Sequence, residues 1–459
     1  MTHDLRKLTS RRSFLKAAGV TAAGLAGLGG LEWSEQLKAR GTLRQKLVAS
    51  QLGIKEQHVG FTDGFVSMPE GAEPVPPFFP DPGAPKPFTT YVFGIRDLTG
   101  MSDAQKFAQK GKAQITAPFL FCEQGQDFRV HLHNLGETLR PIGNPDNHTI
   151  HWHGFPNQIV YFDGVPDNSL AVPIGRELTY RYIPEDPGTY MYHCHIDDVE
   201  HVHLGLTGLV FVHPALSRAT GKKYAYNDPA TQYDREYGIL LTEIDNHAHF
   251  NDAHNQDTDW SDYKAAFRLM NGRAWPDTVE LNVDPTAATL GDLERLRYNP
   301  HSSLIQANEG EKVLIRVANL GFEEHSIVLS GIEMNLVGRD AKPLTAGRPD
   351  YGVDPPVAGG RADISTRTYR LDLGPGESRD AIITAPTFSN HEAFDVYPFY
   401  DRNYSFVNKE TTAAGDGFGG QRTEVRVYAK GTLPEQTRPN GLYDLDKKEW
   451  TWATGTEPL

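Results

Sequence analysis

Cysteine, methionine and long helical periodicity are all scarce in this sequence of 459 residues. Its only cysteines are Cys122 and Cys194, so one disulfide is the most that the chain could form, and a disulfide-rich scaffold is excluded. Few stretches show the 3.6-residue period of an amphipathic helix, which argues against a helical bundle. The longest weakly apolar run, residues 17–31, is too short for a comfortable membrane span.

A basic surplus is also missing. The formal net charge is −14, and the acidic excess is spread along the chain rather than gathered in one block. A chain of this kind repels polyanions, so we expect neither nucleic acid nor an anionic membrane as a partner.

The first residues have the composition of an export signal. Arg11 and Arg12 stand side by side before the Ala/Gly-rich run of residues 17–31, which is the twin-arginine form of a bacterial signal. We therefore predict a signal over residues 1–31 and a periplasmic or extracellular protein exported by the twin-arginine pathway. No clear Ala-x-Ala site follows, so the cleavage position stays open.

The remaining composition predicts an all-β protein. There are 44 glycines, 31 prolines and 10% aromatic residues, and short β-branched or aromatic runs recur between turns. The length favours two domains. Glu123-Gln-Gly-Gln-Asp-Phe-Arg-Val before His148 is echoed by Glu309-Gly-Glu-Lys-Val-Leu-Ile-Arg-Val before His325, which indicates a duplicated β domain. The predicted division is an extended N-terminal arm over 32–88, a first domain over 89–216, a second over 233–432 and a C-terminal tail over 433–459.

Seven of the 18 histidines fall in two short stretches, residues 147–154 and 192–206. Because residues two apart in a strand point to the same face, His151 and His153 lie side by side, and so do His193 and His195, with Cys194 pointing the opposite way. One strand can therefore serve metals on both of its faces.

The residue types favour copper. A cysteine thiolate with two imidazoles and a weak or absent axial ligand selects a blue copper ion, and paired imidazoles on facing strands suit further copper or zinc. Cys122 lies in the apolar strand Pro-Phe-Leu-Phe-Cys and is interpreted as a buried thiol.

The stretch from 118 to 214 resembles the cupredoxin domain of multicopper oxidases. The matching motifs are Thr149-Ile-His-Trp-His-Gly, Asp163-Gly-Val-Pro, Pro187-Gly-Thr-Tyr-Met-Tyr-His-Cys-His and Gly205-Leu-Thr-Gly-Leu-Val-Phe-Val. A weaker likeness continues in Leu269-Met-Asn-Gly-Arg-Ala-Trp-Pro-Asp-Thr and the strand leading to His325. The resemblance implies two cupredoxin-like Greek-key β-sandwich domains with copper as the cofactor.

The resemblance also implies roles for individual residues. The type 1 copper would be bound by His148, Cys194 and His201. A type 2 copper would face His151, and a type 3 pair would face His153, His193 and His195. Asp163 matches the family acid that helps to protonate bound oxygen, although an ordinary turn aspartate explains it equally well.

The type 1 loop departs from the family pattern. The second imidazole usually follows the cysteine by five residues, whereas His201 follows Cys194 by seven, so two residues are inserted and His203 competes for the role. His201 is preferred because it keeps the five-residue step to Leu206. Leu206 occupies the axial position where methionine is often found, and a non-ligating side chain there should raise the reduction potential of the copper.

The second domain departs further. A family trinuclear site needs eight histidines from two facing domains, but a rough alignment places Val328, Ser330, Pro398 and Tyr400 at the equivalent positions. Two arrangements could still give a working inner copper site. Two first domains could face one another across a twofold axis in a homo-oligomer. Alternatively, the half-site could hold a single type 2 copper, as in two-domain copper nitrite reductases, although His151 stands where that family has an aspartate.

The leading function is therefore a copper oxidoreductase of the multicopper oxidase type, with dioxygen as the electron acceptor. Its reductant would be a small molecule, a metal ion or a small redox protein, and the six methionines argue against cuprous ion. The alternatives are a copper nitrite reductase and a non-enzymatic blue-copper electron-transfer protein. His247, His249 and His254 could bind another metal ion, but a solvated loop is the favoured interpretation.

Overall fold

The computed structural model describes residues 52–69, 78–139, 146–155, 158–345, 362–403, 409–410, 417–418 and 420–455. The chain divides into two compact units, residues 1–53 and 54–459, and every element named below lies in the second. The predicted twin-arginine signal, residues 1–31, falls outside the described residues. None of the described helices has the length and apolar character needed to cross a bilayer.

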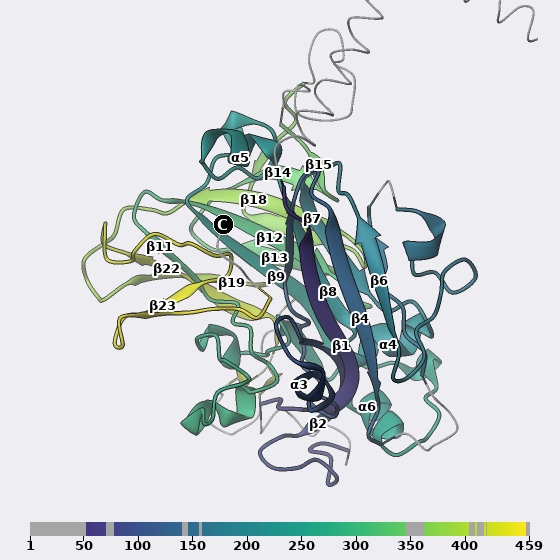
Figure 1. Cartoon of the computed structure of the whole chain (residues 1–459). Helices are drawn as coiled ribbons and strands as arrows, with labels where there is room; N and C mark the ends of the chain where they lie inside the picture. The colour runs from purple at the N-terminus through teal and green to yellow at the C-terminus, as the bar shows by residue number, and fades with distance from the viewer. Residues whose placement is uncertain are drawn as a thin grey trace, which may run out of the picture. The chain divides into compact units, whose positions relative to one another are not determined.

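Two four-stranded sheets form a first β-sandwich (Figure 1). The first sheet has the order β2-β1-β4-β6, and its strands are β1 (Lys55–Val66), β2 (Thr90–Asp97), β4 (Phe128–Gly136) and β6 (Glu177–Tyr182). The second has the order β3-β8-β7-β5, with β3 (Leu120–Glu123), β5 (His151–His153), β7 (Gly188–His193) and β8 (Thr207–His213). Apolar residues of both sheets, Cys194 among them, form one buried core.

The expected N-terminal arm contains the strand β1. Over residues 55–66 the chain pairs with β2 on one side and β4 on the other, so the interpretation of 32–88 as an extended arm does not hold for this part. Two glycines inside the strand concealed it, because glycine weakens a strand pattern. Gly64 is required by packing, since a Cβ there would lie 2.7 Å from the backbone nitrogen of Ala113.

A second sandwich repeats the topology of the first. One sheet has the order β10-β9-β12-β18-β14-β15, with β16 paired to β14, and the other has the order β11-β22-β19-β13-β17. Both sandwiches are traversed in the same sequence with the same pairings, since β1 and β4 are parallel, as are β9 and β12, and β3 and β8 are parallel, as are β11 and β22. This repetition agrees with the duplicated β domain that the sequence predicted.

The strands of the second sandwich are mostly short. They are β9 (Arg235–Ile244), β10 (Phe267–Met270), β11 (Ile305–Asn308), β12 (Lys312–Asn319), β13 (His325–Leu329), β14 (Met334–Arg339), β15 (Lys342–Pro343), β16 (Thr366–Thr368), β17 (Arg370–Leu373), β18 (Ser378–Thr384), β19 (Asp395–Asp401) and β22 (Arg422–Tyr428). Two further hairpins pair β20 (Lys409–Glu410) with β21 (Gly417–Phe418) and β23 (Leu442–Asp444) with β24 (Glu449–Thr451).

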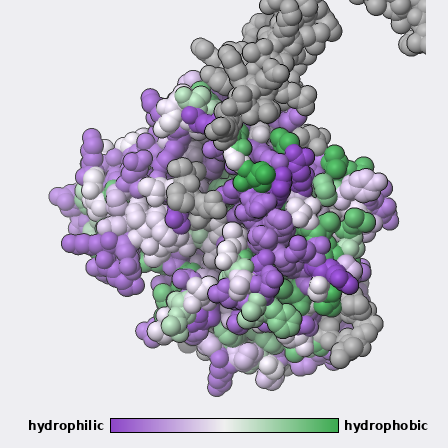
Figure 2. Space-filling view, viewed as in Figure 1, coloured by the Kyte–Doolittle hydropathy of each residue, from purple (hydrophilic) through white to green (hydrophobic). Residues whose placement is uncertain are grey.

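The helices are short and occupy loops. They are α3 (Asp103–Phe107), α4 (Asp198–Leu204), α5 (Ala215–Thr220) and α6 (Asn246–Ala253). The face of the molecule seen in Figure 2 is mostly hydrophilic, with separate hydrophobic patches, as the high charge content leads one to expect.

The two sandwiches share a buried apolar contact. Phe119 and Phe211 of the first cluster with Leu240 and Leu320 of the second. Beside them the buried guanidinium of Arg316 pairs with Glu236, at 2.5 Å from Nε to Oε1. Residues 54–459 therefore pack as one body around this contact.

Candidate metal centres

The histidine-rich stretches lie together because β5 and β7 are antiparallel neighbours. His151 stands opposite His193, and Trp152 opposite Tyr192. Trp152 and Tyr192 point into the core, whereas the histidines of these strands point to the other face of the sheet. The alternation expected from the sequence is thus present, with Cys194 following β7 on the core side.

On the core side, His148, Cys194 and His201 bring their ligand atoms within 4.8 Å of one another, and all three residues are buried. The sulfur of Cys194 lies 3.6 Å from Nδ1 of His148 and 3.3 Å from Nδ1 of His201. Two donors bound to one ion at about 2.0 and 2.3 Å and about 120° apart would be separated by about 3.7 Å. A thiolate with two imidazoles at this spacing fits a trigonal copper ion.

The surroundings of this cluster are apolar except for the buried carboxylate of Glu137, which lies 3.0 Å from Nε2 of His148. The Phe61 ring lies 5.4 Å from the ring of His148, and the Phe93 ring lies 5.4 Å from that of His201. Leu206 is fully buried in the same core, and its backbone N–H donates to the carbonyl of His201. Burial raises the pKa of the Cys194 thiol to about 12, so the proton stays on sulfur until a metal ion displaces it.

His201, not His203, faces the cysteine. Both lie on α4, but their rings point to different neighbours. Nε2 of His203 accepts a hydrogen bond from the backbone N–H of Asp245 at 3.0 Å, and its ring lies among Trp260 and other aromatic residues. The geometry therefore favours the residue preferred from the sequence.

On the opposite face, His151, His153 and His193 form a second group whose ligand atoms also lie within 4.8 Å of one another. The ring of His195 lies 5.0 Å from that of His151 and 5.6 Å from that of His193. Burial is the main cause that lowers the pKa of His151, His153 and His193, the last to about 3. The imidazoles are neutral at pH 7, as metal ligands must be.

Backbone carbonyls fix the tautomers of two of these histidines. Nδ1 of His151 donates to the carbonyl of Asp163 at 2.6 Å, and Nδ1 of His193 donates to the carbonyl of Cys194 at 2.8 Å. In each ring Nε2 then carries the lone pair that a metal ion needs. The second hydrogen bond also joins the two clusters through the backbone of Cys194.

Asp163 lies beside the second cluster, but its carboxylate is 3.8 Å from Nδ1 of His151 and about one-third exposed. Its carbonyl makes the closer contact. The turn is held against the histidine strand by Gly164, where a Cβ would lie 2.2 Å from the carbonyl oxygen of Ile150. The motif Asp-Gly-Val-Pro thus has a packing reason as well as a candidate chemical one.

Comparisons with known proteins show which proteins this chain resembles in sequence and fold. Residues 92–215 match the sequence profile of the family described as multicopper oxidase. Putative laccase-9 of Oryza sativa subsp. japonica is 27% identical over 59% of this chain and 38% of its own length, and Laccase-11 of Arabidopsis thaliana is 25% identical over 65% and 47%. The chain thus spans less than half the length of these curated relatives.

Two solved structures share the fold. The blue copper oxidase of Nitrosomonas europaea superposes with a TM-score of 0.51 at 18% identity, over 82% of this chain and 86% of that one. The multicopper oxidase mgLAC gives 0.52 at 17% identity, over 84% and 88%. Residues 92–215 therefore form a multicopper oxidase domain. The sandwiches of this chain are accordingly cupredoxin-like.

In the second sandwich no histidine stands at the places equivalent to those of the histidines on β5 and β7. Its strands β13 and β19 correspond to β5 and β7, and Val328 stands opposite Tyr400 as His151 stands opposite His193. The residues equivalent to His193 and His195 are therefore Tyr400 and Arg402, so the rough alignment to Pro398 and Tyr400 was wrong by two residues. A two-residue slip keeps the strand face, so periodicity alone did not reveal it.

The same register shows what stands in place of the cluster of His148, Cys194 and His201. His325 corresponds to His148, and Asp401 corresponds to Cys194. Nδ1 of His325 lies 2.9 Å from Asp401 and Nε2 lies 2.7 Å from Glu243, and all three side chains are buried. Burial alone would lower the pKa of His325, but the two carboxylates raise it to about 9. The second sandwich therefore holds a protonated imidazole between two carboxylates at the position where the first sandwich has a thiol and two imidazoles.

The three histidines suggested as a further metal site, His247, His249 and His254, do not come together in the structure. Residues 246–253 form the helix α6 rather than a solvated loop. His249 is buried with Nδ1 2.6 Å from the carbonyl of Tyr91, His254 contacts Asp81, and His247 is exposed. Among the described residues, only the two clusters on β5, β7 and α4 gather three metal-ligating groups.

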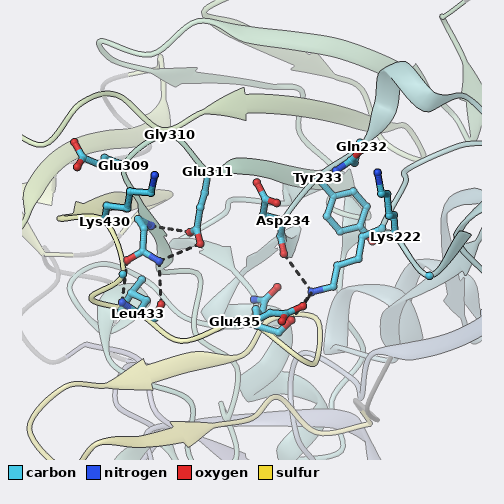
Figure 3. Close-up of a pocket in the computed structure, with 15 residues that line it drawn as sticks. Lys222, Gln232, Tyr233, Asp234, Glu309, Gly310, Glu311, Lys430, Leu433 and Glu435 are labelled. Carbon is cyan, nitrogen blue, oxygen red and sulfur yellow. Dashed lines mark hydrogen bonds and ion pairs between the residues drawn. The ribbon is translucent and has the colours of Figure 1, made fainter.

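A polar cavity of 620 Å³ lies elsewhere in the molecule (Figure 3). Lysines and carboxylates line it, but Glu311 is paired with Arg235, and Lys223 lies near Glu435. Neither cysteine nor histidine contributes to its wall. None of its lining residues belongs to either candidate metal cluster.

Proposed function

We propose that this protein takes single electrons from a reductant at a type 1 copper held by His148, Cys194 and His201. We further propose that it delivers them to dioxygen at an inner copper site held by His151, His153, His193 and His195. The observation that carries the proposal is the back-to-back placement of the two ligand sets, joined by the hydrogen bond from His193 to the carbonyl of Cys194 at 2.8 Å.

Copper bound at these positions would accept one electron at a time and reduce dioxygen, whose conversion to two waters consumes four electrons and four protons. The side chains and backbone around these positions would exclude water, orient the imidazoles and exchange protons. Aromatic and aliphatic side chains keep water from Cys194, and backbone carbonyls hold the inner imidazoles in the tautomer that presents Nε2. Asp163, at the edge of the inner cluster and partly exposed, is placed to exchange protons with solvent.

The inner site needs a second copy of the chain to reach the eight histidines of the family pattern. We propose a homo-oligomer in which two such four-histidine faces meet. The support is exposed apolar surface beside the cluster, where Ile159, Val160 and Tyr161 precede the Asp163 turn and are 55%, 58% and 65% exposed. Apolar patches of this kind mark protein interfaces.

Copper counting with spectroscopy tests the proposal. The copper-loaded protein should show a blue absorption band, a near-ultraviolet shoulder and about four coppers per paired site, and should consume oxygen with a phenolic or diamine donor. A strict monomer with one or two coppers would refute the shared site. Oxygen uptake that stays at the rate of the metal-free protein would refute the oxidase.

The two cysteines offer a matched pair of variants. Cys194→Ser should abolish the blue band and oxygen uptake, because sulfur is the ligand that gives the band its charge-transfer character. Cys122→Ala, also a fully buried cysteine, should keep both. If the blue band survives Cys194→Ser, the type 1 assignment is wrong.

We also propose that the protein is exported with residues 1–31 as a twin-arginine signal. The support is the Arg11-Arg12 pair before the Ala/Gly-rich run. Replacing both arginines with lysine should retain the protein in the cytoplasm of a bacterial host. Export of that variant at the parent level would contradict the pathway.

A further inference from the structure

Three histidines gather on the outer face of the first sheet, away from both clusters. His58 lies on β1, and His131 and His133 lie on β4, where His58 and His131 are paired across the two parallel strands. Their neighbours Val59 and Leu132 point into the core, so the three imidazoles point outward and are half-buried. The position is on the opposite side of the sheet from Cys194.

Two of these rings bring nitrogen atoms into close approach. Nδ1 of His58 lies 2.9 Å from Nε2 of His133. Two nitrogen ligands at about 2.05 Å from one ion and at a right angle to each other would lie about 2.9 Å apart. The spacing is that of neighbouring ligands in a tetragonal site, the geometry that Cu²⁺ and Ni²⁺ prefer.

Neighbouring groups orient both rings. Nδ1 of His133 lies 3.1 Å from the carboxylate of Glu177, so this nitrogen carries the proton and Nε2 presents a lone pair towards His58. His131 stacks on His58 at 4.2 Å with an interplanar angle of 9°, and its Nδ1 lies 2.9 Å from Oγ1 of Thr179. Nε2 of His131 is buried and has no hydrogen-bond partner.

A positively charged side chain already lies beside the close approach of His58 and His133. Nζ of Lys106, from α3, lies 3.4 Å from Nδ1 of His58 and donates towards it. Nδ1 of His58 therefore faces both the ammonium group of Lys106 and Nε2 of His133. Two imidazole nitrogens this close together, with a cation beside them, form a position that a metal ion could occupy in place of the ammonium group.

We propose that His58 and His133 form a third metal site, on the surface of the first sandwich, for a divalent ion that favours tetragonal nitrogen ligands, Cu²⁺ before others. Lys106 leaves when the ion binds, since its side chain is flexible and its charge repels a cation. Glu177 keeps His133 in the ligating tautomer, and His131 supports the ring of His58. The proposal does not depend on the proposed oxidase function.

The test adds Cu²⁺ to tag-free protein whose two other clusters are already copper-saturated. The parent should take up one further equivalent, seen by calorimetry and by a new spin-resonance signal with nitrogen hyperfine structure. The double variant His58→Asn/His133→Asn should lose this equivalent and keep its blue band. Lys106→Met should bind the ion about tenfold more tightly, because a like charge has been removed from a partly exposed site.

His247→Asn is the matched control, because it removes an exposed histidine elsewhere and should bind the extra ion as the parent does. Thermal melts and the blue band report whether each variant is folded. The proposal is overturned if the double variant retains the extra equivalent, or if Lys106→Met leaves its affinity unchanged.

Discussion

Leu206 is the residue that decides the axial environment of the proposed type 1 copper. It is fully buried in the core that holds Cys194. Leu206→Met conserves volume and should cost less than about 1.5 kcal/mol of stability, while a thioether near the ion should lower its reduction potential. Redox titration of the blue band measures the change. A potential that stays the same or rises would show that this side chain does not face the ion.

His325 should make the stability of the protein depend on alkaline pH. Its pKa is raised to about 9 from an ordinary 6.5, so the stabilisation is complete below about pH 6.5 and is lost as the pH rises through 9. The shift corresponds to about 3 kcal/mol.

The experiment is denaturant unfolding of the parent and of His325→Gln at pH 6.5 and 9.5. The free energy of unfolding of the parent should fall between these values, whereas the variant should be less stable at pH 6.5 and change less. Equal pH dependence in both proteins would argue against a charged His325.

At the scale of elements, the turn between β17 and β18 contacts the inner cluster. A Cβ on Gly376 would lie 3.1 Å from Nε2 of His153. Gly376→Ala should therefore displace this imidazole and slow oxygen reduction severalfold, with the blue band unchanged. Gly431→Ala is the matched control, since Gly431 has a similar φ of +80° and its Cβ would meet nothing within 4 Å. Equal oxygen uptake in both variants would show that this turn does not position the imidazole of His153.

For the whole molecule, the proposed pairing of copies should be sensitive to charge beside the inner cluster. Val160→Asp places a carboxylate in the exposed apolar patch and should give monomers that keep the blue band but reduce oxygen poorly. Ile364→Asp, at a residue that is 61% exposed, should leave the assembly intact. Light scattering and oxygen uptake check both. An intact oligomer in Val160→Asp would place the interface elsewhere.

The division into domains at 89–216 and 233–432 stays a prediction. The repeated strand order supports two sandwiches, but their shared apolar contact and the buried hydrogen bond from the Arg316 guanidinium to Oγ1 of Thr189, at 3.0 Å, join them. Limited proteolysis between residues 217 and 232 would tell whether either sandwich persists alone.

The sequence by itself determined the strand face on which each candidate ligand lies. Alternation along a strand needs only the backbone period, so the separation of Cys194 from His151, His153, His193 and His195 could be predicted before any tertiary structure. The duplication could also be predicted, because the two copies keep similar strand sequences before His148 and His325.

Only the tertiary structure decided which residues meet across strands and loops. The choice of His201 over His203 rests on the direction of two rings on α4, and the equivalence of Asp401 to Cys194 rests on the pairing of β13 with β19. The close approach of His58 to His133 depends on two parallel strands far apart in sequence. Such contacts are set by register and packing, which a one-dimensional pattern does not contain.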